Sequence, residues 1–246
     1  MIRLLQAVAF ILLLASQAAP QPPALVIGAA SGFPPYQFVA DGRPAGFDVD
    51  VAKAIAGRLG VEARFVQGEW DNVVSMLRFG RIDVIVGMEV NAFRRGYFDF
   101  SVPYSKRHDA VFVLAGNPAS SVEDLFGQVV TGDRHSFVEL LWREQGIHRK
   151  IRVTQTPTKE EAMRLLAGGK TVAAIMPLEV GRYLAREAGV DVRVLLNPDP
   201  GSEVAIALRK GHTRQLADLN AALRDIRDNG ELDAIVHKWF DPPAGK

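Results

Sequence analysis

The chain lacks cysteine altogether in its 246 residues. This absence excludes disulfide bridges, thiolate metal sites and a lipid anchor attached through a cysteine. The five histidines, His108, His135, His148, His212 and His237, are scattered, and none pair at the spacing of metal ligands. We therefore expect no metal and no cofactor in this protein.

An excess of either charge is also missing. The chain has 29 basic and 28 acidic side chains, a formal net charge of +1, and no block of like charges. Phosphate binding favours a concentrated basic surface, so nucleic acid is not an expected partner. Hydrophobic residues make up 48% of the chain, which is enough for one large domain or two small lobes.

Long apolar runs are absent except at the N-terminus. Arg3 precedes an apolar stretch from Leu4 to Ala15, and Ser16-Gln17-Ala18 offers small residues for cleavage. The run is shorter than the ~20 residues of a comfortable membrane span, which favours a signal peptide over residues 1–19. A retained anchor is the alternative. The sequence predicts a periplasmic protein that is not a lipoprotein.

Strand and helix patterns alternate, which indicates an α/β architecture. Strand patterns at 24–29, 63–66 and 82–86 enclose a helix that starts at Asp48 as its cap and a second helix over 70–79. This unit resembles half of an open parallel sheet, whose ligands bind beyond the carboxyl ends of the strands.

A second small unit follows, and two helices close the chain. Strand patterns cover 128–131 and 172–176, and two capping boxes begin at Ser136 and Thr158. The β-rich segments 110–115 and 204–208 flank this unit. We expect them to be the hinge segments that cross between two lobes.

Six motifs occur in an order that resembles the bacterial extracellular solute-binding proteins of family 3, the periplasmic proteins that bind polar amino acids for ABC transporters. They are Phe33-Pro34-Pro35-Tyr36, the run from Gly46 to Ala52, Glu69-Trp70-Asp71, Gly80-Arg81-Ile82-Asp83, Arg94 with Asp99 to Tyr104, and Lys238-Trp239-Phe240. The resemblance implies a two-lobed type II periplasmic-binding-protein fold. It divides the chain into residues 22–112 with 200–246 as the first lobe and 113–199 as the second.

Arg94 is the leading candidate for a ligand contact. A guanidinium offers a fork of donors that matches a carboxylate, and the resemblance places the ligand carboxylate at this position. Its neighbour Arg95 is expected to face solvent. Phe33 and Trp70 are expected to form aromatic walls, although packing in the core is the alternative for both.

The resemblance also implies ligand contacts from the stretch before Arg94 and from the second lobe. These contacts involve Gly87, Met88, Glu89, Asn91, Ser136 and Glu179. Pro177 stands where the family usually has an aspartate that pairs with the ligand's ammonium group, so Glu179 or Glu89 is a candidate replacement. The ligand is then either an amino acid held differently or a carboxylate without an α-amine.

The sequence predicts binding without catalysis. The protein would capture a small polar carboxylate, an amino acid first, by hinge closure and deliver it as a monomer to an ABC-transporter permease. One alternative is a periplasmic dehydratase that acts on prephenate or arogenate, with Glu179 or Glu89 as its acid. Another is the sensor part of a signalling receptor, which the lack of a membrane span or output domain before Lys246 disfavours.

Overall fold

The computed structural model describes residues 23–133, 136–195 and 200–241. The expected signal peptide over 1–19 lies outside these residues. Within them, no helix combines the length and the apolar character that crossing a membrane requires.

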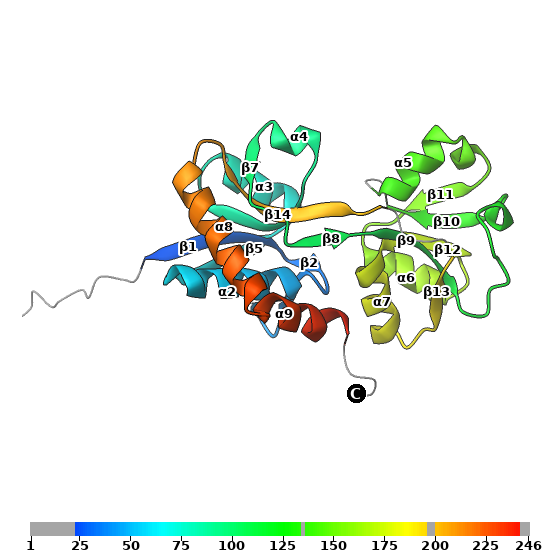
Figure 1. The fold of residues 1–246 in the computed structure, drawn as a ribbon. Helices are drawn as coiled ribbons and strands as arrows, with labels where there is room; N and C mark the ends of the chain where they lie inside the picture. The colour runs from blue at the N-terminus through cyan, green and yellow to red at the C-terminus, as the bar shows by residue number, and fades with distance from the viewer. Residues whose placement is uncertain (1–22, 134–135, 196–199, 242–246) are drawn as a thin grey trace, which may run out of the picture.

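The described chain forms two lobes, each built around its own sheet (Figure 1). The first sheet has the order β5-β1-β6-β14-β7, with β8 also paired to β14. Strands β1 and β5 are parallel, as are β1 and β6, whereas β14 runs antiparallel to β6, β7 and β8. The bounds are β1 (Ala24–Ala30), β5 (Glu62–Gly68), β6 (Val84–Glu89), β7 (Phe98–Phe100), β8 (Ser105–Arg107) and β14 (Ser202–Arg209).

A smaller antiparallel sheet accompanies the first lobe. It consists of β2 (Gly32–Phe33), β3 (Gln37–Ala40) and β4 (Arg43–Ala45). Five helices complete this lobe: α2 (Phe47–Leu59), α3 (Trp70–Arg78), α4 (Ala92–Arg95), α8 (Thr213–Asp228) and α9 (Glu231–Phe240).

Helices cover both faces of the first sheet because its strands alternate their side chains. Val84 and Val86 of β6 join the apolar cluster that includes α2 and α8, whereas Ile85 between them joins the cluster that includes α3. Helix α2 ends at Gly60, whose φ of 67° suits glycine. The expected cap at its start is wrong: Gly46 is the N-cap, and Asp48 lies buried in the first turn.

The second lobe has a five-stranded sheet in the order β11-β10-β12-β9-β13. Its strands are β9 (Asp109–Leu114), β10 (Val129–Gly132), β11 (Arg152–Gln155), β12 (Ala173–Pro177) and β13 (Val192–Val194). Helices α5 (Phe137–Glu144), α6 (Lys159–Ala167) and α7 (Leu178–Glu187) accompany them, with the short 3-10 turns η1 (Glu123–Leu125) and η2 (Ile147–Arg149).

The chain crosses between the lobes twice, and neither expected hinge segment is a crossing. Residues 110–115 lie mostly in β9, which pairs with β12 and β13, and residues 204–208 lie in β14 of the first sheet. The first crossing falls between Arg107, where β8 ends, and Asp109, where β9 begins. We therefore propose the first boundary at His108 in place of the expected one after residue 112.

Candidate functional site

A cavity of about 450 Å³ lies between the lobes. From the first lobe it is lined at the carboxyl ends of the parallel strands β1, β5 and β6, where open sheets place their ligands. From the second lobe it is lined by residues 156–160. The lining residues are Ala30, Ser31, Gly32, Phe33, Gln37, Gly68, Glu69, Trp70, Gly87, Glu89, Arg94, Arg107, Thr156, Pro157, Thr158, Lys159 and Glu160.

Arg94 reaches this cavity from the single turn of α4. The Asn91 side chain caps that turn by accepting a hydrogen bond from the Arg94 backbone N–H at 2.8 Å. The guanidinium Nη1 donates to the Glu89 carbonyl at 2.8 Å, and the group lies 5.7 Å from the centre of the Trp70 ring. Burial lowers the pKa of Arg94, and Glu89 opposes that shift. The guanidinium nevertheless stays charged, because its pKa is far above neutrality.

A second arginine, Arg107, lines the cavity from the end of β8 and was not expected there. Its Nη2 contacts Asp48 Oδ2 at 2.5 Å, and its Nη1 donates to the Gly87 carbonyl at 2.9 Å. Its guanidinium lies 5.1 Å from the Phe33 ring centre and 4.3 Å from that of Tyr36. Arg107 is 7% exposed, and its contacts with the rings of Phe33 and Tyr36 hold these aromatic side chains in place.

Asp48 is the acceptor at the centre of this buried network and is 0% exposed. It also accepts hydrogen bonds from Gln37 Nε2 and from the Tyr104 hydroxyl, each at 2.7 Å. Burial lowers the pKa of Arg107, but Asp48 and the other nearby oxygens outweigh burial and raise it. The hydrogen-bonded ion pair of Arg107 and Asp48 therefore supports the part of the cavity lining that Arg107 forms.

Gly87 allows the backbone to pass directly over this network. Its φ is +74°, and a Cβ there would collide with the side chains of Gln37 and Asp48. Glycine is required on both counts. The Gly87 carbonyl is thereby free to receive Arg107.

Glu89 places a carboxylate between the two arginines. Its oxygens lie 4.0 Å from Arg94 Nη1 and 3.9 Å from Arg107 Nη1, beyond hydrogen-bonding distance of either. Two other acidic residues, Glu69 and Glu160, line the cavity.

The second-lobe wall is the loop that leads into α6. Thr158 caps this helix by accepting from the Glu161 N–H at 3.2 Å, and Lys159 pairs with Asp133 at 2.6 Å. Ser136 caps α5 in the same way at 3.1 Å but is not among the lining residues.

The structure thus brings together Phe33, Trp70, Gly87, Glu89 and Arg94 in one cavity, among the residues that the sequence singled out. Asn91 supports Arg94 through its cap, and the Met88 side chain is fully buried in the apolar cluster of α3. The remaining two candidates, Ser136 and Glu179, lie outside the lining.

Glu179 is occupied by its own helix. Its carboxylate accepts from Arg182 at 2.9 Å, and burial raises its pKa. Pro177 ends β12 opposite Asp109 of β9. At these two positions, Pro177 and Glu179, the second lobe therefore presents no carboxylate to the cavity.

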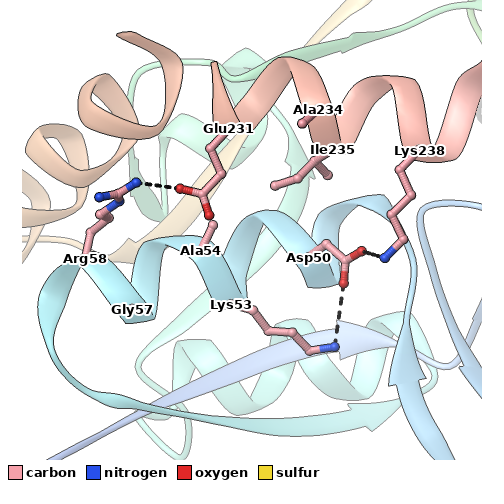
Figure 2. A pocket seen from close by; sticks show the side chains of 9 residues that line it. All are labelled: Asp50, Lys53, Ala54, Gly57, Arg58, Glu231, Ala234, Ile235 and Lys238. Atoms are coloured by element: carbon pink, nitrogen blue, oxygen red, sulfur yellow. Dashed lines mark hydrogen bonds and ion pairs between the residues drawn. The ribbon is translucent and has the colours of Figure 1, made fainter. Parts of the chain in front are cut away.

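Another hollow, of about 620 Å³, lies elsewhere, between α2 and α9 (Figure 2). Its charged groups satisfy one another: Arg58 contacts Glu231 at 2.7 Å, and Asp50 contacts Lys238 at 2.6 Å and Lys53 at 3.6 Å. This groove is consequently a seam between two packed helices, and we assign it no ligand.

The model of the bacterial extracellular solute-binding proteins, family 3, matches residues 25–242. The chain belongs to this family. The match spans both lobes and the cavity between them, which confirms the expected family and the two-lobed type II fold.

Among its relatives, the L-cystine-binding protein TcyJ of Escherichia coli is 29% identical over 228 residues, which are 90% of this chain and 84% of the relative. Among solved structures, an ancestral arginine-binding protein bound to arginine is 32% identical with a TM-score of 0.75, covering 88% of this chain and 98% of the other. A histidine kinase sensor domain is 30% identical with a TM-score of 0.76, covering 89% and 96%. The family assignment confirms a solute-binding protein and not an enzyme.

Proposed function

We propose that this protein captures an amino acid outside the cytoplasm, acts as a monomer and delivers its ligand to an ABC-transporter permease. The observation that carries the proposal is Arg94, a charged guanidinium aimed into an interlobe cavity beside the aromatic ring of Trp70. Amino-acid binding by the family and by the relatives above supports this ligand class.

Each wall of the cavity has a proposed role. Arg94 takes the ligand carboxylate through its fork of donors. Phe33 and Trp70 sandwich the aliphatic part of the ligand, and the backbone from Gly87 to Asn91 borders the ligand's charged end. We propose no ligand contact for Ser136 or Glu179, since neither lines the cavity.

Closure is the second part of the proposal. The segment 156–160, which leads into and begins α6, faces the first lobe across the cavity, so a rotation of the lobes brings its hydroxyl groups onto the bound ligand. The closed pair of lobes then presents a surface that the open protein lacks.

Substitution of Arg94 tests the proposal. A thermal-shift screen of amino acids first identifies ligands, since a ligand at 100 times its Kd adds ~2.7 kcal/mol to stability. Calorimetry on Arg94→Ala is then expected to show no binding. Arg95→Ala is the matched control, because Arg95 stacks on Phe100 and lies outside the cavity lining. Unchanged affinity in Arg94→Ala would overturn the assignment.

Ligand sensing is a second candidate, favoured by the similarity to a histidine kinase sensor domain. Uptake of a labelled ligand by cells that lack this gene separates the two. Transport predicts that uptake falls, whereas sensing predicts that uptake persists and only a response to the ligand is lost.

A further inference from the structure

Among the residues that line the cavity, more acidic than basic side chains lack a partner of opposite charge within hydrogen-bonding distance. Arg107 is held by Asp48 at 2.5 Å, and Lys159 is held by Asp133 at 2.6 Å. Of the cations in this lining, only Arg94 has no carboxylate within hydrogen-bonding distance. Glu69, Glu89 and Glu160 line the same space.

Glu89 is the acidic residue nearest to the expected carboxylate site. Its side chain is 38% exposed, and among the described residues no donor makes a hydrogen bond to its carboxylate. Within the described part of the chain, its ionic contacts are the two long ones, 4.0 Å to Arg94 and 3.9 Å to Arg107. A ligand carboxylate on Arg94 therefore meets a neighbouring negative charge, unless the ligand brings its own cation.

An α-amino acid brings that cation to the correct place. Its ammonium and carboxylate groups share one carbon, so the acceptor for the ammonium must lie within a few ångströms of the arginine that takes the carboxylate. Glu89 meets this requirement through its 4.0 Å contact with Arg94.

The other acidic groups near the cavity meet the requirement less well. Asp48 is fully buried and already accepts from Gln37, Tyr104 and Arg107. Glu179 is bonded to Arg182 and lies outside the lining. Glu69 and Glu160 are exposed, and in the described part of the chain neither forms an ion pair with Arg94 as Glu89 does.

We infer that Glu89 binds the α-ammonium group of the ligand, so that the first lobe alone holds both charged ends of an amino acid. This inference rests on the proposed function and narrows it. The ligand must carry a free α-amine next to its carboxylate, which excludes simple carboxylates as the main ligands.

The test compares each amino acid with its analogue that lacks only the α-amine. Suitable pairs are L-arginine with 5-guanidinopentanoate, L-lysine with 6-aminohexanoate, and L-glutamine with glutaramate. Calorimetry on the full chain gives the ratio of the two affinities for wild type, for Glu89→Gln and for the control Glu69→Gln. Circular dichroism verifies that each variant is folded.

We expect wild type to prefer the amine-bearing member of a pair by about 10-fold or more, which matches the lower end of the coupling measured for close charge pairs. Glu89→Gln is expected to lose most of that preference while its affinity for the des-amino analogue stays the same or rises. Glu69→Gln should keep the preference.

Three results would overturn the inference, and they differ in how much of the proposed function they also overturn. If Glu89→Gln keeps the wild-type preference, another group binds the amine and amino-acid capture still stands. If wild type binds the des-amino analogues equally well, carboxylate capture stands without amine recognition. If wild type binds neither member of any pair, the proposed function fails together with the inference.

Discussion

The buried pair between Arg107 and Asp48 has a larger energetic role than any exposed ion pair described above. Both groups are removed from water, so breaking the pair leaves a buried charge without compensation. Exposed pairs such as Arg164 with Glu161 stay in contact with water, which screens their attraction. The free energy of unfolding is therefore sensitive to substitutions of Arg107 or Asp48 that change the charge.

Asp48→Asn is expected to lower the free energy of unfolding by about 3–5 kcal/mol, measured by urea denaturation. The substitution keeps the size of the side chain and removes the charge that balances Arg107. Asp50→Asn on the same helix is the matched control, because Asp50 pairs with the exposed Lys238 and retains an acceptor oxygen for Trp239. We expect the control to lose about 1 kcal/mol or less. Equal losses in the two variants would contradict a special role for the buried pair.

Glu179 makes the stability of the fold depend on pH. Burial raises its pKa above that of the unfolded chain, and Arg182 offsets only part of the shift. Stability from this group is thus fully present below the unfolded pKa and is lost as pH rises through the folded pKa. Glu179→Gln should match the Tm of wild type near pH 4 and exceed it at pH 7. A wild type that is the more stable of the two at pH 7 would show that the Arg182 contact dominates.

At the scale of single residues, the sequence singled out several side chains that line one cavity. Phe33, Trp70 and Arg94 follow strand ends, so their meeting at one sheet edge follows from the parallel order of β1, β5 and β6. Arg107 and Gln37 were missed because their roles arise from contacts with Asp48 that are 59 and 11 residues away in sequence. Asp48 itself was misread as a helix cap, since its partners lie in other elements.

Two helices of the second lobe begin with the same capping device, and only one begins at the cavity. Both Ser136 and Thr158 were predicted from the Ser/Thr-x-x-Glu pattern, and both cap as predicted. The pattern is local, whereas the direction of each helix start depends on the packing of its lobe. The sequence therefore identified both caps, and the cavity is lined by Thr158 and not by Ser136, which was the candidate contact.

Removing each cap separates stability from binding. Ser136→Ala and Thr158→Ala are each expected to lower the free energy of unfolding by ~1 kcal/mol in chemical denaturation. Only Thr158→Ala should also weaken ligand binding, by about fivefold, since its hydroxyl borders the cavity. Calorimetry on both variants provides the comparison. A similar loss of affinity in Ser136→Ala would place α5 at the ligand instead.

The strands were predicted more reliably than the connections between them. The patterns at 24–29, 63–66 and 128–131 match β1, β5 and β10 to within two residues, because their apolar runs are buried in sheets. The hinge segments were misplaced because a buried strand and a buried crossing have the same apolar composition. The pairing of β9 with β12 and β13 shows that residues 109–112 belong to the second lobe.

At the scale of the whole molecule, ligand binding should make the protein more compact. Solution X-ray scattering of wild type is expected to show a smaller radius of gyration with a saturating ligand from the thermal-shift screen than without it, as the lobes rotate together. Arg94→Ala at the same ligand concentration should show no change. A wild type that binds ligand in calorimetry with a constant radius of gyration would rule out closure.

The contacts on either side of His108 have a mechanical consequence. Arg107 is fixed to the first lobe by Asp48 and Gly87, and Asp109 is fixed to the second by its pairing in β9 and by its carboxylate, which accepts from the Phe137 N–H at 2.9 Å. His108, between these two residues, is also held by the second lobe, because its carbonyl accepts a hydrogen bond from the Leu178 N–H at 2.7 Å. This crossing is therefore a short pivot and not a flexible tether, so the lobes can turn about it only through the backbone torsions of the few residues from Arg107 to Asp109.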